Sequence, residues 1–479
     1  MAFRLPVAFL LLTSLEQTGI DAADKISPAS AKAAMRKSVD FHRKNVSASG
    51  GYLWRFSPDL KMREGERKAG EETAWVQPPG TPTVGQAYLD AYRLCGERYL
   101  LDAAKETGYA LVQGQLHSGG WDYRIEFNPK QRTKYNYRVN PVRENARNVT
   151  TLDDDNTQSA LRFLMRLDQQ LNFRDKKIHS CVEYALHKLL QAQYPNGAWP
   201  QRFSAPPDKE KYPVKKAQYP KKWSRTDPKL DYRSYYTFND DTIADMIETM
   251  FDAASIYGGK RMRAAALKAG DFIILAQMPE PQPAWSQQYN ANMEPAWARR
   301  FEPPAVTGGE SQGVMRTLIE LYRRTGEKKY LAPIPQALAY LKRSKRKDGR
   351  LARFYELKTN TPLYFTKDYK LTYSDADMPT HYGFIIGSKL EQIERAFDAA
   401  SKLEKFDSDV SLVMPASKRT SGITNAAQSV LNSMDDRGVW LVEDHLRDKS
   451  HEVHPDKIVS MSAYAKNLVT LARYVGAKR

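Results

Sequence analysis

The stretch QGQLHSGGW, residues 113–121, recurs as QAQYPNGAW at residues 191–199, and each copy follows an apolar helical run. Recurrence of this kind indicates structural units that pack against their neighbours. Their spacing is uneven, which excludes a solenoid of identical units. The same ending, an apolar run followed by a turn and then a large apolar residue, occurs at four further positions: Trp54, Trp285, Leu351 and Trp440.

Helical periodicity precedes most of these endings. In VGQAYLDAYRL (84–94), TQSALRFLMRL (157–167), TIADMIETMFDAAS (242–255) and GVMRTLIELYR (313–323), apolar residues recur every three and four positions. A short turn and a second helix follow most of them. We therefore predict a mainly α protein, an α/α toroid of repeated helix hairpins with a substrate groove at one rim. Strand patterns are confined to short runs such as RLARFYEL.

The tryptophans at the ends of the hairpins allow two interpretations. A tryptophan after a glycine turn more often packs over its hairpin than stacks on a sugar. We assign Trp54 and Trp440 to packing. For Trp199 and Trp285 both interpretations stay open.

The charge balance favours an anionic partner. The chain has 479 residues, with Lys+Arg 73 against Asp+Glu 56 and a net charge of +17. Residues 209–229 form a Pro- and Lys-rich insertion whose default interpretation is a solvated loop. The two cysteines, Cys95 and Cys181, lie in apolar helical patterns, which indicates core residues and leaves one disulfide open.

Two acidic clusters precede predicted helices at equivalent points of successive hairpins. The first is TLDDDNTQ (151–158), and the second is the NDD of SYYTFNDDTIADM (234–246). One Asp could cap each helix. Three adjacent carboxylates repel one another, however, and favour a cation such as Ca²⁺. In a toroid both clusters lie on the same rim, so we expect them to converge on one ion.

Arginines follow in two later segments. The long loop 285–313 carries Arg299 and Arg300 together with Glu302, and residues 350–365 add Arg353. Loops of this length are commonly functional. Acids for a cation beside arginines for carboxylates indicate an acidic sugar polymer. The sequence shows no phosphate-loop, zinc-protease or serine-hydrolase motif and no nucleic-acid-binding module.

The motifs together resemble the pectic acid lyase family, the pectate lyases of polysaccharide lyase family ten. They follow the family's order over residues 50–365: QGQLHSGGWDY, TLDDDNTQ, QYPNGAWPQRF, YTFNDD, WSQQY, PAWARRFEPPAVTGGES and ARFYELKTN. The resemblance implies an α/α toroid that cleaves polygalacturonate or pectin by calcium-assisted β-elimination, leaving unsaturated oligogalacturonates. It also implies a lyase whose bound cofactor is Ca²⁺.

Site residues follow from the resemblance position by position. The cation ligands would be Asp153, Asp154 and Asp240, the catalytic base would be Arg299, and Arg353 would hold a substrate carboxylate. We further predict substrate contacts from four residues in the same motifs: Tyr355, Asn239, Gln288 and Trp199.

The chain departs from the family pattern at two positions. Asp154 stands where asparagine is expected, which makes the pocket more anionic. Thr361 stands where arginine is usual, so one contact to a substrate carboxylate is in doubt.

The N-terminus MAFRLPVAFLLLTSLEQTGIDAADK has the layout of a secretory signal peptide. We predict a signal peptide over residues 1–23, a catalytic toroid over 24–400 and a helical hairpin over 401–479 that completes the ring. The protein is then secreted or periplasmic, a monomer, and bound to neither nucleic acid nor membrane. The alternatives are a lyase on another uronate polymer, a hydrolase using Glu302 and Glu310, and an inactive binding protein that keeps the groove.

Overall fold

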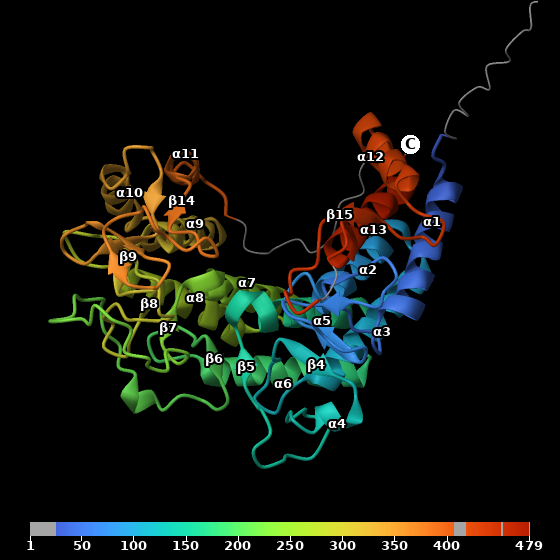
Figure 1. Cartoon of the computed structure of the whole chain (residues 1–479), viewed down its shortest axis with the longest axis horizontal. Helices are drawn as coiled ribbons and strands as arrows, with labels where there is room; N and C mark the ends of the chain where they lie inside the picture. Colours follow the sequence, from blue (N-terminus) through green and yellow to red (C-terminus); the bar gives the residue numbers. More distant parts are fainter. Residues whose placement is uncertain (1–24, 407–417, 452–453, 479) are drawn as a thin grey trace, which may run out of the picture.

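The computed structural model describes residues 25–406, 418–451 and 454–478, so the predicted signal peptide lies outside the described residues. Helices dominate this part of the chain (Figure 1). Their bounds are α1 Pro28–Phe41, α2 Thr81–Cys95, α3 Arg98–Gly114, α4 Pro129–Arg132, α5 Asn156–Gln170, α6 Lys176–Ala192, α7 Thr242–Tyr257, α8 Lys260–Leu275, α9 Gly308–Thr325, α10 Ile334–Arg343, α11 Leu390–Ala400, α12 Ser421–Asn432 and α13 Met461–Gly476.

The long helices pair into antiparallel hairpins that stand side by side. The pairs α2–α3, α5–α6, α7–α8 and α9–α10 each pack internally, and the first helices α2, α5 and α7 also pack in series, with α13 against α2. The predicted α/α toroid of repeated hairpins is therefore confirmed. In Figure 1 the ring is open between α11 and α12, which lie on opposite sides of the view.

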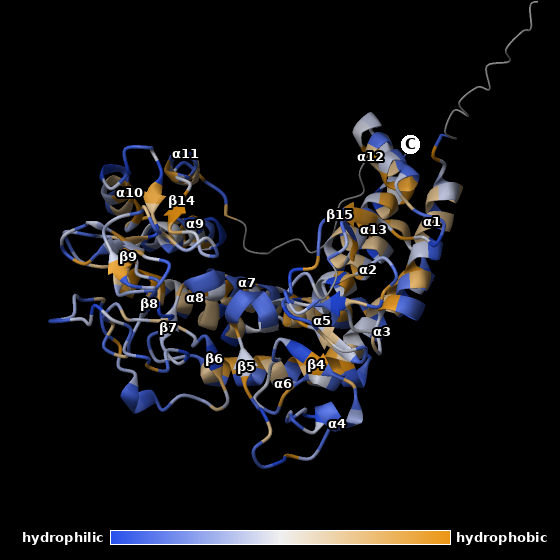
Figure 2. Ribbon diagram, in the orientation of Figure 1, coloured by the Kyte–Doolittle hydropathy of each residue, from blue (hydrophilic) through white to orange (hydrophobic). Residues whose placement is uncertain are grey.

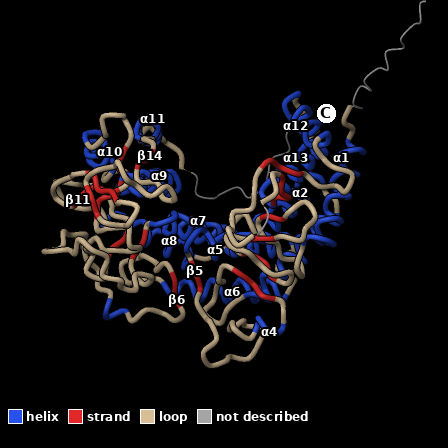
Figure 3. Tube along the Cα trace, in the orientation of Figure 1, coloured by secondary structure: helices blue, strands red, loops and turns tan. Residues whose placement is uncertain are grey.

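Short antiparallel strand pairs cover one rim of the ring. In each pair one strand directly precedes the first helix of a hairpin and the other follows its second helix. Figure 3 shows them as short red segments among tan loops. The pairs are β3 (Thr73–Trp75) with β4 (Arg124–Glu126), β5 (Thr150–Thr151) with β6 (Arg202–Phe203), β7 (Tyr236–Thr237) with β8 (Gln288–Tyr289), and β9 (Ala305–Thr307) with β11 (Phe354–Glu356).

The remaining strands extend this pattern toward the two ends of the ring. Strand β16 precedes α13 and pairs with β1, which follows α1. The other bounds are β1 Arg55–Phe56, β2 Arg63–Glu64, β10 Leu351–Ala352, β12 Pro362–Phe365, β13 Leu371–Thr372, β14 Ile385–Ile386, β15 Leu441–Glu443 and β16 Lys457–Ser460.

The recurring tryptophans close the second helices. The indole N–H donates to a carbonyl in the last turn of the preceding helix: Trp121 to Leu111, Trp199 to Leu189, Trp285 to Ile273 and Trp440 to Val430, each at 2.8 Å. The last carbonyls of a helix lack the intrahelical partner that earlier carbonyls have, and the indole N–H supplies one here. Trp199 is fully buried, so its predicted contact with substrate is not supported. The packing interpretation holds for Trp199, Trp285 and Trp440.

Trp54 packs differently from the others. It is half-buried, meets the ring of Trp75 edge-on at 6.1 Å between centroids, and donates to the carbonyl of Gln77 at 2.7 Å. It therefore covers a loop rather than the end of a helix.

The last hairpin packs against the first helices of the chain. Helix α13 lies against α1, α2 and α12, and Figure 2 shows apolar residues (orange) along this group. The Tyr88 hydroxyl bonds both Tyr52 at 2.8 Å and Tyr464 at 3.0 Å, which ties three segments together in the core. The division at residue 400 stays a prediction.

Two further predictions concern the cysteines and the basic insertion. Cys95 and Cys181 are both free thiols. Residues 209–229 are largely exposed but anchored: Ala217 N donates to the Leu275 carbonyl at 2.7 Å, and Trp297 Nε1 donates to the Ser224 carbonyl at 2.9 Å. The insertion is thus fixed at both places rather than free in solvent. None of the described helices combines the length and apolar character that crossing a bilayer requires.

Candidate active site

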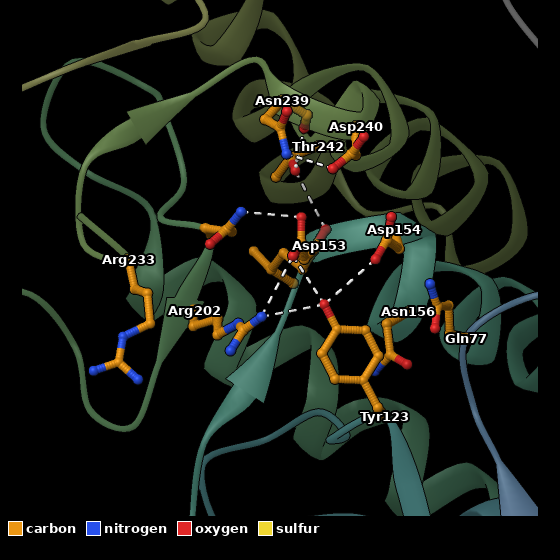
Figure 4. Close-up of polar contacts among 12 residues, drawn as sticks. Gln77, Tyr123, Asp153, Asp154, Asn156, Arg202, Arg233, Asn239, Asp240 and Thr242 are labelled. Carbon is orange, nitrogen blue, oxygen red and sulfur yellow. Dashed lines mark hydrogen bonds and ion pairs between the residues drawn. The ribbon is translucent and has the colours of Figure 1, made fainter. Parts of the chain in front are cut away.

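Three carboxylates meet at the rim. Asp153, Asp154 and Asp240 each offer an oxygen, and these oxygens lie within 4.8 Å of one another. Figure 4 shows Asp153 and Asp154 beside Tyr123, with Asp240 approaching from the neighbouring hairpin. Asp153 is buried, Asp154 half-buried and Asp240 exposed. The two acidic clusters of the sequence thus lie together.

Matching backbone geometry brings the two clusters together. Each forms a 3₁₀ turn, η2 (Asp153–Asp155) and η4 (Asn239–Asp241), directly before α5 and α7. In both turns the second and third residues are left-handed, with φ of 53° and 56° at Asp154 and Asp155. The equivalent φ values in η4 are 47° at Asp240 and 54° at Asp241. Aspartate tolerates this conformation better than most residues, and such strained turns concentrate at functional sites.

Asp155 does not cap its helix. We expected one of the three acids to accept backbone N–H bonds at the start of α5, yet the Asp155 side chain makes no such bond. Its two oxygens accept instead from the guanidinium of Arg162, at 2.7 and 2.6 Å. This ion pair fixes the third residue of the turn and turns its carboxylate away from the cluster.

The segment after each of two tryptophans supplies partners for Asp153. The Tyr123 hydroxyl donates to Asp153 Oδ2 at 2.8 Å, Gln201 Nε2 donates to Asp153 Oδ1 at 3.0 Å, and Arg202 lies 3.4 Å from Asp153 Oδ2. Sequence reasoning did not single out these three residues. Their signal was position, because each follows Trp121 or Trp199 by two or three residues within a quoted motif.

Burial and mutual repulsion raise the pKa values of the cluster. Burial, followed by the charges of Asp153 and Asp240, raises the pKa of Asp154 to about 7. Burial, followed by the charge of Asp153, raises the pKa of Asp240 to about 6. Full ionisation is therefore unfavourable without a counter-charge. A set of oxygen-only donors at this spacing fits a hard divalent cation such as Ca²⁺.

The cluster forms part of the wall of a cavity of about 650 Å³. Five of the seven other charged lining residues are arginines, and the remaining two are Glu66 and Asp122, so several guanidinium groups line the same cavity as the acidic cluster. The lining includes Arg67, Arg124, Arg147, Arg202, Arg299, Tyr123, Tyr135, Tyr232, Trp75 and Gln77. This arrangement suits a chain of carboxylates that also contacts a cation.

Arg299 lines this groove and is held by Glu302. Its Nε and backbone N donate to Glu302 oxygens at 2.9 and 3.0 Å, and the Glu302 side chain is 2% exposed. Burial acts to lower the pKa of Arg299, but the hydrogen bond and charge of Glu302 outweigh it, and the pKa lies above its ordinary value. Arg299 is thus a firmly protonated cation in this arrangement.

Arg353 lies close to Arg299 through a shared tyrosine. Arg353 donates to Glu310 Oε1 at 3.0 Å and stacks over the Tyr382 ring at 4.6 Å. The Tyr382 hydroxyl donates to Glu302 Oε1 at 2.9 Å, the same oxygen that holds Arg299. Tyr382 was not predicted, because it lies beyond the last motif of the resemblance.

Three of the predicted substrate contacts lie outside the groove. Tyr355 is 1% exposed, and its hydroxyl donates to the Ser344 carbonyl at 2.8 Å. Gln288 is 3% exposed and donates to the Trp297 carbonyl at 2.7 Å. Asn239 is also buried and bonds the Asp240 carboxylate. The Tyr355 hydroxyl and the Gln288 amide N–H are used within the protein, so direct contact of these two residues with substrate is not supported. The Oδ1 of Asn239 is buried beside the cluster without a hydrogen-bond partner.

Comparison with known proteins agrees with the motifs. The family model described as pectic acid lyase matches residues 115–321, which confirms the predicted resemblance over that range and supports a lyase acting on polysaccharides. Both acidic clusters and Arg299 fall inside the matched segment. A search of the curated proteins gives no match.

Solved structures give distant likenesses. A family 10 polysaccharide lyase from Cellvibrio cellulosa, as a variant in complex with trigalacturonic acid, is 19% identical, covers 68% of this chain and 98% of its own, and has a TM-score of 0.45. A D-mannose isomerase is 15% identical over 94% of this chain and 97% of its own, with a TM-score of 0.43. An α-mannanase from Bacteroides thetaiotaomicron is 10% identical over 93% and 95%, with a TM-score of 0.41.

Proposed function

We propose that the protein is a pectate lyase that cleaves polygalacturonate by calcium-assisted β-elimination. One observation carries the proposal. Three carboxylates from two successive hairpins converge within 4.8 Å in a groove lined by arginines, inside the segment that matches pectic acid lyases. A cation site beside arginines is what a reaction on a uronate chain requires, because both neutralise substrate carboxylates.

Asp153, Asp154 and Asp240 would hold the Ca²⁺ ion. Bound there, the ion would neutralise a substrate carboxylate and stabilise negative charge that develops beside it. Tyr123 and Gln201 hold Asp153 in position through the two hydrogen bonds described above. Arg202, next to Gln201, presents a further guanidinium to the groove and can pair with a substrate carboxylate.

Arg299 is the proposed base for the proton at C5 of the uronate. It must lose its own proton first, and Glu302 opposes that loss by stabilising the guanidinium. Arg299 therefore has to separate from Glu302 in the reacting complex, while Tyr382 keeps a hydrogen bond to the same Glu302 oxygen. Once the C5 proton is taken, the oxygen at C4 leaves and a double bond forms between C4 and C5.

Arg353 is the proposed partner of the carboxylate at the reacting residue. Negative charge spreads from C5 into that carboxylate as the proton leaves, so a guanidinium there stabilises the transition state more than the ground state. Each well-placed donor of this kind contributes on the order of 10²–10³-fold in rate.

Hydrolysis by Glu302 and Glu310 is disfavoured. A glycosidase needs two carboxylates that face the scissile bond. The side chains of Glu302 and Glu310 are 2% and 6% exposed, and each is paired with an arginine. Neither is available to a sugar in this arrangement.

The test is formation of the unsaturated product, followed by its ultraviolet absorbance. We expect absorbance to rise on polygalacturonate with Ca²⁺ and not with EDTA. Polymannuronate and polyguluronate are the other substrate arms. If absorbance rises only on polymannuronate or polyguluronate, the protein is a lyase of that polymer rather than of polygalacturonate. If it rises on no uronan, the lyase proposal is wrong. If it rises equally in EDTA, the proposed role of calcium is wrong.

Matched variants test the residue roles. Arg299→Ala and Asp153→Ala are expected to abolish product formation while the folded protein persists by circular dichroism. Arg350→Ala and Asp398→Ala remove the same charges at exposed positions away from the groove and serve as controls. We further propose that the protein is secreted or periplasmic and monomeric, which fractionation and sedimentation can check.

A further inference from the structure

A second cavity has a volume of about 660 Å³. Three segments that are distant in sequence build it: the insertion at 225–229, the loop at 297–300, and residues 365–373 around the β12–β13 turn. The lining residues are Arg225, Thr226, Asp227, Lys229, Trp297, Arg300, Phe365, Asp368, Tyr369, Lys370, Leu371, Thr372 and Tyr373. The basic insertion thus gains a structural role that its sequence did not reveal.

The cavity holds three cations without a carboxylate partner. Within the described ranges, the side chains of Lys229, Arg300 and Lys370 form no ion pair. The Arg300 guanidinium lies 3.5 Å above the centre of the Tyr369 ring, which orients it while leaving its N–H edge for a ligand. Two acids, Asp227 and Asp368, also line the cavity, and the sum of these five charges is positive.

Aromatic rings form the apolar part of the lining. Trp297 and Phe365 are nearly buried and meet edge-on at 6.1 Å between centroids, while Tyr373 is 55% exposed. Trp297 and Phe365 therefore support the cavity from within, and Tyr373 is the ring that is open to a ligand. An exposed ring beside unpaired cations suits an anionic sugar, because the ring packs against the apolar face of the pyranose and the cations bind its carboxylate. A plain anion would use the cations and leave this ring unused.

The cavity is fixed in place rather than formed by loose loops. The Trp297 indole donates to Ser224 of the insertion at 2.9 Å, and the guanidinium of Arg225 pairs with Glu356 on β11 and stacks over Trp223 at 4.3 Å. Asp227 accepts from the backbone N of Lys229 at 2.8 Å. These contacts join the insertion to the segment that also carries Arg299.

The two cavities share one stretch of chain. Arg299 lines the groove and Arg300, its neighbour in sequence, lines the second cavity. Adjacent Cα atoms lie about 3.8 Å apart. The linings of the two cavities therefore come together at this pair of arginines, and a polymer, unlike a single sugar, is long enough to contact both.

We propose that this second cavity binds a uronate residue of the same acidic polysaccharide chain whose reacting bond lies in the groove. The inference rests on the proposed function for the identity of the polymer. It predicts that long substrates gain affinity from the insertion and that short ones do not. The site would thus favour polymer over the short products of cleavage.

The test compares two double variants that lose equal charge from the same two segments. Lys229→Ala/Lys370→Ala alters the cavity. Lys221→Ala/Lys367→Ala is the control, since neither lysine lines the cavity and Lys367 pairs with Asp377 at the surface. Steady-state kinetics on polygalacturonate and on trigalacturonate give kcat and KM for each protein.

We expect the ratio of kcat/KM on polymer to kcat/KM on trimer to fall about threefold to tenfold in the cavity variant, through KM, and to stay at the wild-type value in the control. An unchanged ratio in the cavity variant would overturn the proposal. An equal fall in the control would also overturn it, because the effect would then be general electrostatic attraction.

Binding separates this inference from the lyase itself. If wild-type protein cleaves no uronan, the proposed function fails, but calorimetric binding of polygalacturonate in EDTA still tests the cavity. Weaker binding by the cavity variant than by the control supports it, and equal binding refutes it. Dextran sulfate is the final arm: an equal loss of affinity there would show a general polyanion site and refute the assignment to a uronate.

Discussion

Asp154 is the residue at which the proposed cation site departs from the pattern expected of pectic acid lyases, since a carboxylate stands where an amide is expected. Its pKa of about 7, together with about 6 for Asp240, means that the cation-free cluster keeps protons that an unfolded chain would release. The folded state therefore binds more protons than the unfolded state between about pH 4 and about pH 7. Over that range the free energy of unfolding of cation-free protein should fall as pH rises.

Asp154→Asn should flatten this dependence. In EDTA, the loss of thermal stability of the wild type between about pH 5 and about pH 7 should exceed that of the variant, because the variant lacks one titrating group. Calcium should raise the Tm of the wild type more at the higher pH. Thermal melts measure both effects, with Asp398→Asn as control. If the Tm of wild type and of Asp154→Asn changes equally with pH, Asp154 does not have the raised pKa described above.

Glu302→Gln should shift the pH profile of the reaction. Glu302 holds the pKa of Arg299 above its ordinary value, and proton abstraction needs neutral Arg299, so the rate should rise with pH. Removing the charge of Glu302 should move that rise to lower pH by about one unit or more. Rate profiles over pH measure it, with Glu394→Gln as control, since Glu394 is half-buried and pairs with Lys342 rather than with a residue of the groove. An unshifted profile would mean that another group takes the proton.

The sequence predicted site residues correctly where both the residue type and its position in a motif pointed to the same role. Asp153, Asp154, Asp240 and Arg299 were named from motif position, and all four line the same cavity. Tyr355 and Gln288 were chosen from motifs too, but a hydroxyl or amide bonds equally well to a buried carbonyl as to a sugar. Sequence does not separate those two uses, whereas the structure shows the carbonyl in both cases.

At the scale of elements, the helices followed from periodicity and the rim strands did not. A strand of two or three residues, such as β5 or β7, is too short to show alternation. The turns η2 and η4 were predicted to carry cation ligands, but their left-handed backbone was not predicted. Their paired left-handed residues have no sequence rule for aspartate, although the recurrence of adjacent acids before α5 and α7 was a visible signal.

Trp199→Phe tests whether the tryptophan is a helix cap or a sugar platform. The change leaves the buried Leu189 carbonyl without its donor, which should cost about 1–3 kcal/mol of the free energy of unfolding. KM for polygalacturonate should stay unchanged. Denaturant unfolding and kinetics give the two values, and Trp440→Phe should lose similar stability through Val430. If KM rises and the free energy of unfolding stays unchanged, Trp199 contacts the substrate and does not cap the helix.

At the scale of the whole molecule, the net charge of +17 should make polymer binding depend on salt. The affinity of Arg299→Ala protein for polygalacturonate should fall steadily as sodium chloride rises from about 0.01 M to about 1 M, because the screening length shortens from about 30 Å to about 3 Å. Calorimetry at fixed calcium measures it. Affinity that is independent of salt would mean that the cation and close contacts alone hold the chain.

Helix α1 can reach its folded position only after the last helices of the ring are available, because they cover its apolar face. Its buried face, which includes Ala31, Met35 and Val39, packs against α12 and α13. The bond from the Tyr474 hydroxyl to the Ile26 carbonyl spans 448 residues of sequence. During synthesis, α1 emerges long before α12 and α13, so its apolar face stays uncovered until those helices have been made. Contacts of such long range are slow to form, and a chaperone that shields α1 should therefore raise the yield of folded protein.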